Sequence, residues 1–406
     1  MPTGKTHWFL KTKNFGLVIG FVFSVFFCLA GLFSGLFGNL ESKILDTYFS
    51  FKGIVTKDAV QKGVWRDEGN PAINQDIMIV GIDLKALQKY GSWPFPRTVH
   101  GELVNSFARI QNQDEREKAL FLDIFFIDKG DPSDDAALAK SITDSNTVFL
   151  ETILENSPIG ETIDGEMFDR QKILFDRHGS FTNVRGDWKN MNASGGLQTN
   201  LAEMNRATAG YGVANVVPDE MDKIVRRQPL VAKYSKLLNE IPFEALGGDF
   251  SVDESLFERM SWFDKKGFEH QIDLPLTENK LAKLKKEIYK SAPPLMYDAD
   301  GDGSSESETR VIEIYQDYFM PSIAFSLALR YWGCTPADCE IIPGKRITVK
   351  RAGKDEITIP VDENCAILIN YMGGASSIAA DGPKTFPVRS YAGYARETAE
   401  DRAEWP

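Results

Sequence analysis

The stretch that decides the fold runs from residue 77 to 141 and reads IMIVGIDLKALQKYGSWPFPRTVHGELVNSFARIQNQDEREKALFLDIFFIDKGDPSDDAALAKS. Two runs in it, 77–80 and 119–126, are apolar except for Asp123, which is typical of strands buried on both faces of a helix-covered sheet. Between them, apolar residues recur at helical spacing at Val99, Leu103, Phe107 and Ile110. Strand, helix and strand predict a βαβ unit with a right-handed crossover. We therefore expect an α/β fold.

Further apolar patterns extend this unit into one large domain over residues 40–395, a mixed sheet covered by helices, with a tail over 396–406. The predicted strands lie at 147–154, 210–217, 228–234, 311–315, 346–349, 356–360 and 366–370. Helices are predicted at 281–289 and from Pro321, where Gly333 ends the helix. The weakly patterned segments 156–209 and 251–310 are predicted to be insertions.

Several strings resemble the extracellular CHASE sensor domain of type two. The most specific is Trp93-Pro94-Phe95-Pro96-Arg97, and similar strings lie at 79–83, 121–126, 212–215, 226–230, 368–373 and 385–387. The resemblance runs from about Leu40 to Ala395, apart from two long stretches. It implies an extracellular domain of a bacterial receptor whose output is a nucleotide cyclase, a histidine kinase, a protein kinase or a diguanylate cyclase. It also implies further membrane spans and a cytoplasmic output domain, which this chain does not contain.

The composition argues against two classes of function. Acidic residues outnumber basic ones by 58 to 46, whereas nucleic-acid binding needs a basic face. The four histidines have no metal-ligand spacing, and neither a nucleophile elbow nor a phosphate-binding loop is present. The sequence therefore shows no catalytic site, and enzymatic activity is expected only from an output domain in a longer form of the protein.

The segment 15–38 carries no charge and predicts a membrane-spanning helix. At about 1.5 Å per residue it would span roughly 36 Å, against about 30 Å of hydrocarbon. Lysines precede it, so residues 1–14 are expected in the cytoplasm and the rest of the chain outside, on a single-pass inner-membrane protein. A cleaved signal peptide is the alternative. Helical spacing at Leu40, Ile44, Tyr48 and Phe51 predicts a helix that continues from the membrane.

Four residues are candidates for ligand binding: Asp83, Trp93, Arg97 and Asp123. Each aspartate lies at or near the end of a predicted strand, and ligands bind at the carboxyl edge of open α/β sheets. A structural interpretation competes with this one. Asp83 can cap the helix that follows it, Asp123 can pair with Arg97, and Trp93 can pack in the core.

The second candidate site is a calcium loop. Residues 298–303 read D-A-D-G-D-G, the first half of an EF-hand loop, in which alternate carboxylates supply the oxygen ligands that Ca²⁺ prefers. The predicted ligands are Asp298, Asp300, Asp302, Ser304 and Glu306. Position twelve falls on Thr309, so a complete EF-hand is not expected, and the ion would have a structural role. An acidic surface turn is the alternative.

A pair of cysteines, Cys334 and Cys339, lies in the string GCTPADC. In an oxidising compartment they could form a disulfide. No second pair accompanies them, so the spacing does not favour zinc.

These features favour a periplasmic sensor that passes an unknown small-molecule or protein signal to a cytoplasmic output, with a nucleotide cyclase as the first expectation and a homodimer as the working assembly. Two alternatives come from other classes. One is an anchored or secreted hydrolase that uses Asp83 and Asp123. The other is a structural envelope protein that is stabilised by calcium.

Overall fold

The computed structural model describes residues 12–33, 43–47, 74, 76–110, 112, 114–155, 165–219, 222–247, 250–298, 306–371 and 386–395. The chain divides into two compact units. The first comprises Met1–Gly81 and Asn370–Arg389, and the second comprises Ile82–Ile369 and Ser390–Pro406.

The first unit contains helix α1 (Thr12–Phe33) and strand β1 (Ile79–Gly81), which pairs with β18 (Val388–Ser390). Helix α1 begins before the predicted membrane span and ends at Phe33, and residues 34–38 lie outside the described residues. Among the helices of the described ranges, none has the length and apolarity to cross a membrane.

A parallel sheet organises the second unit, which confirms the mixed α/β class. Strand β3 (Val148–Glu155) lies between β2 (Leu120–Leu122) and β6 (Gly210–Val213) and is parallel to both. At its far end β3 pairs antiparallel with β5 (Gly196–Gln198). The crossover from β2 to β3 runs through α6 (Pro132–Ser145), so the βαβ unit is β2–α6–β3.

The predicted βαβ unit is therefore wrong in its first strand. The strand near residue 80 is β1, which pairs with β18 and not with β2. The predicted burial of this run on both faces is also wrong, because β1 is half-buried and Ile77 before it is 46% exposed. An apolar run carries no information about which strand lies beside it.

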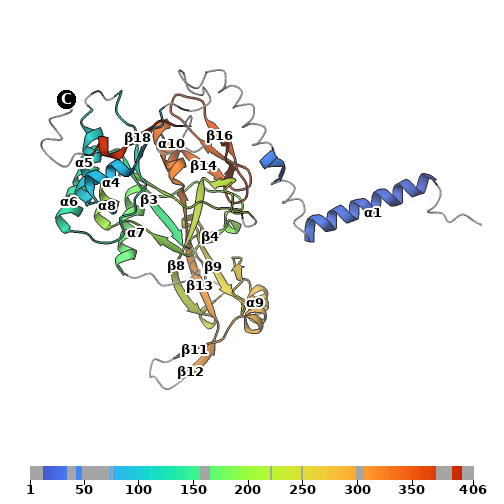
Figure 1. The fold of residues 1–406 in the computed structure, drawn as a ribbon. Coiled ribbons are helices and arrows are strands. Elements are labelled where there is room, and N and C mark those ends of the chain that lie inside the picture. Colours follow the sequence, from blue (N-terminus) through green and yellow to red (C-terminus); the bar gives the residue numbers. More distant parts are fainter. Residues whose placement is uncertain are drawn as a thin grey trace, which may run out of the picture. The chain divides into compact units, whose positions relative to one another are not determined.

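Helices flank this sheet (Figure 1). Their bounds are α4 Leu84–Tyr90, α5 Arg97–Ala108, α7 Gly165–His178, α8 Ala202–Ala207 and α10 Ile323–Trp332. The predicted apolar face of α5 is buried at Val99, Leu103 and Phe107. Helix α10 begins after its cap Ser322, and Gly333 ends it in the left-handed conformation with φ 73°, as predicted.

A second sheet has five strands in the order β10-β9-β13-β8-β4. Their bounds are β4 Ala193–Ser194, β8 Val231–Pro242, β9 Glu258–Phe263, β10 Glu269–Ile272 and β13 Val311–Pro321. The long strands β8 and β13 pair antiparallel along their whole length (Figure 1). Helix α9 (Glu278–Ser291) covers one end, where Met260, Trp262 and Ile288 belong to a separate apolar core.

Smaller sheets complete the unit. The antiparallel sheet β14-β15-β16 consists of Cys339–Ile342, Arg346–Val349 and Ile357–Pro360, the last two close to the predicted bounds. The other pairs are β7 (Arg227–Pro229) with β17 (Ala366–Leu368), and β11 (Leu295–Asp298) with β12 (Glu306–Thr309). Helix α10 and the β14–β16 sheet share one apolar core that includes Phe325, Ile341 and Ile347.

The segments 156–209 and 251–310, which we predicted to be insertions, contribute to both main sheets. The first supplies β5 beside β3 and β4 beside β8, and the second supplies β9 and β10. Strands of two or three residues, such as β4 and β5, are too short to show an alternating pattern in the sequence.

Candidate functional site

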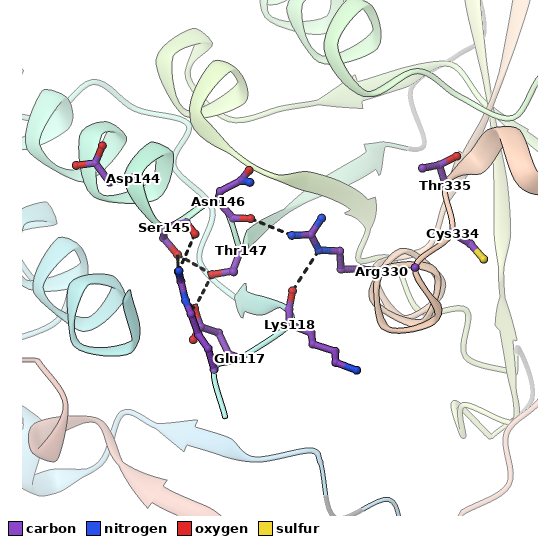
Figure 2. Close-up of a pocket in the computed structure, with 11 residues that line it drawn as sticks. Glu117, Lys118, Asp144, Ser145, Asn146, Thr147, Arg330, Cys334 and Thr335 are labelled. Carbon is purple, nitrogen blue, oxygen red and sulfur yellow. Dashed lines mark hydrogen bonds and ion pairs between the residues drawn. The ribbon is translucent and has the colours of Figure 1, made fainter. Parts of the chain in front are cut away.

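A pocket of about 610 Å³ lies where strands β2 and β3 begin (Figure 2). Its walls are the segment before β2, the turn between α6 and β3, and the end of α10. We call it the amino-edge pocket, and it is lined by Arg116–Lys118, Asp144–Thr147, Arg330 and Gly333–Thr335. The sequence predicted a ligand at the opposite, carboxyl edge of the sheet.

Two arginines hold the walls of the amino-edge pocket together. Arg330 donates from Nε to the carbonyl of Lys118 at 3.2 Å and from Nη2 to the carbonyl of Asn146 at 3.1 Å (Figure 2). Arg116 donates from Nη2 to the carbonyl of Ser145 at 2.7 Å. The last carbonyls of a helix lack partners within it, so these bonds satisfy the end of α6. Arg330 thus links α10 to the start of the parallel sheet.

Glu117 carries the unusual atom of this pocket. Its Oε1 accepts hydrogen bonds from Thr147 Oγ1 at 2.7 Å and from Arg116 Nε at 3.2 Å. Its Oε2 is buried and has no hydrogen-bond partner among the described residues. Buried polar atoms normally find a partner, so this unpaired oxygen is an exception, but because it is buried a molecule in the pocket does not reach it.

Asp83, the first predicted ligand residue, has a structural role. Its carboxylate accepts a hydrogen bond from the Ala86 backbone N–H at 3.0 Å, so Asp83 caps α4. It also accepts a bond from Ser390 Oγ at 2.8 Å. No contact between Asp83 and Asp123 occurs within the described ranges, so the geometry gives no support to a hydrolase that uses these two carboxylates.

The structural interpretation had expected Arg97 to pair with Asp123, and the structure shows a different partner. At the start of α5 its guanidinium donates to the buried carboxylate of Asp135 and to the carbonyl of Asp128. It also lies 5.5 Å from the centre of the Phe126 ring. Asp135 stands in the first turn of α6, so Arg97 joins two helices. Sequence proximity suggested the wrong partner because the crossover helix turns Asp135 towards α5.

Trp93 lies partly at the surface, with 47% of its area exposed, and packs edge-to-face on Phe95 and His100. Its neighbour His100 is buried, and the distance from His100 Nδ1 to the hydroxyl of Tyr391 is 2.8 Å. Burial, and then the charge of Arg97, lower the pKa of His100 to about 4. His100 is therefore neutral at physiological pH. Ligand binding at Trp93, Arg97 and Asp123 stays a prediction.

The fourth predicted residue, Asp123, has a partner that the sequence did not reveal. Asp123 follows β2, and the parallel register places it beside Glu151 of β3. Burial, followed by the negative charge of Asp123 and a hydrogen bond between the two carboxyls, raises the pKa of Glu151 to about 7. The sequence analysis missed Glu151 because a single charged residue in an otherwise apolar strand does not form a recognisable motif. The strand register is the signal that would have paired it with Asp123.

This pair makes stability depend on pH in a defined direction. Between the ordinary pKa of 4.5 and about 7, folded Glu151 keeps its proton whereas unfolded Glu151 loses it. The contribution is complete below pH 4.5 and is lost as the pH rises through about 7. We expect Glu151→Gln to remove up to about 1.4 kcal/mol per pH unit from the slope of unfolding free energy in this window.

Urea unfolding of both proteins at half-unit steps of pH measures this difference in slope. The exposed Glu287, which lies 3.9 Å from Lys283, provides the control variant Glu287→Gln, whose pH profile should follow that of the parent chain. Parallel profiles for the Glu151→Gln variant and the parent would contradict the raised pKa of Glu151.

A buried charge cluster, defined as Lys233, Arg259, Glu269 and Asp317, crosses the five-stranded sheet. Asp317 accepts hydrogen bonds from Arg259 Nε at 2.9 Å and from Ser235 Oγ at 2.5 Å, and Lys233 Nζ lies 3.7 Å away. Arg259 also pairs with Glu269. Burial lowers the pKa of Lys233 to about 8, although the charge of Asp317 opposes this shift.

Two further predictions lie partly or wholly beyond what the structure describes. Residues 299–305 of the predicted calcium loop, with Asp300, Asp302 and Ser304, lie outside the described residues, as do the side chains of Asp298 and Glu306. Within the described ranges, no group of three metal-ligating side chains occurs. Cys334 and Cys339 are buried free thiols, and burial raises the pKa of Cys339 to about 12. The calcium site and the disulfide stay predictions.

No curated protein and no solved structure matches this chain. A family model, described as the CHASE2 domain, matches residues 22–394, which is nearly the whole chain. The chain therefore belongs to the CHASE2 domain family, whose members are extracellular sensory domains.

Proposed function

We propose that this chain is the extracytoplasmic sensor of a membrane receptor and that its signal is a ligand bound in the amino-edge pocket. The observation that carries the proposal is the pocket itself, in which Arg330 from the end of α10 lines the same cavity as Arg116 and Lys118 from the segment before β2. Membership of a sensory family supports the receptor role. Pockets of 300–1,000 Å³ are typical of small-molecule sites, and this one has about 610 Å³.

Signal transmission follows from the bonds that a ligand would change. Arg330 fixes the end of α10 to the carbonyls of Lys118 and Asn146. A ligand that engages its guanidinium biases the position of α10 against the start of β2 and β3. Such a bias reaches an output only if the ligand binds two arrangements of the domain with different affinity.

The remaining parts of the proposal come from the sequence. The uncharged segment 15–38 serves as the membrane anchor, with the N-terminus in the cytoplasm. In our proposal this receptor acts as a homodimer, and its output is a nucleotide cyclase. A structural Ca²⁺ held by the loop at 298–306 stiffens the outer domain.

Cyclic nucleotide levels in cells test this function. In cells that carry the native gene, we expect cyclic AMP or cyclic GMP to change severalfold when the cells move from rich medium to minimal buffer. Arg330→Gln should abolish that change, because the variant loses the charge that joins the ligand to α10. The control is Arg346→Gln, since Arg346 is a half-exposed β15 residue outside the pocket. Equal nucleotide levels in native and gene-deleted cells under both conditions would contradict a cyclase output.

A further inference from the structure

We propose that the outward face of helix α4 rests on the surface of an anionic phospholipid bilayer. The contact is made by a surface that we call the α4 patch, which has an apolar centre and two lysines beside it. Its residues are Ile82, Leu84, Lys85, Leu87, Lys89 and Trp93. This inference goes beyond the proposed function, because it concerns neither the ligand of the pocket nor the output.

Helix α4 is short and buries only one of its sides. Ala86 and Tyr90 are buried, and their spacing of four residues places them on the side that faces the domain. Leu84 points away from that side and is 68% exposed, and Leu87, on the next turn, is 38% exposed. Outward positions of a surface helix normally carry polar residues. The two leucines therefore make an apolar face that the described residues leave exposed.

Trp93 extends this apolar face beyond the end of α4. Tyr90 packs edge-to-face on Phe95 with the ring centres 5.5 Å apart, and Phe95 packs in the same way on Trp93 at 5.4 Å. These rings hold Trp93 beside α4, although 47% of its area is exposed. Ile82, just before the cap of α4, is 40% exposed. Exposed apolar side chains gathered on one surface, with polar residues at its rim, are typical of an interaction site.

The residue types of the α4 patch fit the interface of a membrane. Leucine and tryptophan enter the boundary between head groups and acyl chains, and lysines on the polar side meet the lipid phosphates. Lys85 and Lys89 lie one turn apart on α4, and both are exposed. The carboxylate of the neighbouring Asp83 is already engaged by the N–H of Ala86 and the hydroxyl of Ser390. The patch therefore presents positive charge to an anionic surface.

A second copy of the chain is the other partner to consider, and two observations argue against it. The four apolar side chains, each only partly exposed, supply far less than the about 800 Å² per partner of a standard protein interface. A two-fold axis through the patch would also bring the lysines of the two copies together. A bilayer brings phosphates to the same lysines. For a chain held by the anchor proposed above, a weak contact is sufficient, because the local concentration of lipid is high.

Fluorescence from a dye in the α4 patch tests this contact in the full chain. The labelling site is Gln88→Cys, since Gln88 is an exposed residue of α4 between the leucines and the lysines. The background is Cys28→Ser, because the other three cysteines are buried. The chain, labelled with a nitrobenzoxadiazole dye, is reconstituted into vesicles of phosphatidylcholine with or without phosphatidylglycerol.

We expect the dye to be at least about twofold brighter in the vesicles that contain phosphatidylglycerol, because the patch then lies in the head-group region. Lipids that carry a nitroxide should quench it there. The control is the same dye at Lys172→Cys in the same background, since Lys172 is an exposed residue of α7 outside the patch. That dye should show neither effect.

Variants of the patch separate its two parts. Leu84→Ser combined with Leu87→Ser should return the dye to its brightness in pure phosphatidylcholine. Lys85→Gln should lower the ratio of bound to unbound patch about fivefold, the effect of one lysine at an anionic surface. Leu238→Ser is the matched control, because it removes a leucine of β8 that is 44% exposed and lies outside the patch. It should behave as the parent chain does.

Three results would overturn the inference. The first is equal brightness in the two kinds of vesicle, without quenching by nitroxide lipid. The second is an unchanged signal in the double serine variant, with circular dichroism showing that it is folded. The third is brightness that rises with the density of protein and not with phosphatidylglycerol, which would assign the patch to a second copy of the chain.

Discussion

Replacing Asp317 by alanine is expected to lower the free energy of unfolding by about 3–5 kcal/mol, the cost of leaving a buried charge without its partner. The side chain of Asp317 is completely buried. It is the acceptor for Arg259 at 2.9 Å and the nearest carboxylate to Lys233 at 3.7 Å. Without it, two cations remain in the interior, and Glu269 alone faces Arg259.

The alternative to a charge effect is a simple cavity, and a second variant separates the two. Arg259→Met in the Asp317→Ala background removes one of the two remaining cations while keeping most of the side-chain volume. We expect it to restore part of the lost stability, because buried ion pairs replaced by apolar residues are often neutral or better. If a cavity caused the loss of stability, the second substitution would leave that loss unchanged.

Urea unfolding of the full chain, followed by circular dichroism, measures these differences. The control is Asp144→Ala, which removes an exposed carboxylate paired with Lys140, and such surface pairs contribute at most about 1 kcal/mol. A loss below about 1 kcal/mol in the Asp317→Ala variant would show that water or side-chain rearrangement relieves the buried charges.

Elements that depend on neighbours along the chain could be predicted from the sequence. The apolar spacing of Val99, Leu103 and Phe107 identified α5, and the Gly333 signal placed the end of α10. Asp83 was recognised as a possible cap because an N-cap needs only its own side chain and the next three residues. Local rules of this kind do not require the tertiary fold.

The candidate site could not be predicted in the same way, because its parts meet only through the fold. Glu117 and Arg330 come from distant parts of the chain, and neither lies in a motif. A single charge in a strand, such as Glu151 or Asp317, has the same pattern as a residue on a solvent-facing side. Only strand register and burial reveal that these charges face a partner inside the protein.

The second large effect is expected at Gly212, where β6 passes the start of α10. A Cβ atom at this position would lie 2.4 Å from Ile323 Cα and 2.5 Å from Ile323 N. Both are backbone atoms, so no side-chain rotation can make room. Ile323 cannot withdraw easily, because the N–H of the preceding Ser322 donates to the Leu230 carbonyl at 2.8 Å. We expect Gly212→Ala to lower the free energy of unfolding by about 1–3 kcal/mol or more.

The same substitution should reach the amino-edge pocket, because α10 begins at the clash and carries Arg330 in its last turn. Displacing α10 moves the guanidinium away from the Lys118 and Asn146 carbonyls, so the cyclic-nucleotide response that depends on Arg330 should fall together with stability. Gly393→Ala is the control, since its added Cβ would meet nothing within 4 Å, and its stability should stay within about 0.5 kcal/mol of the parent chain. Urea unfolding of the purified variants and nucleotide levels in cells that carry them give both quantities. If Gly212→Ala were as stable as Gly393→Ala, the expected clash between the added Cβ and the backbone of Ile323 would be contradicted. If it lost stability but kept the full nucleotide response, the pocket would not depend on the position of α10, and the proposed route from ligand to helix would fail.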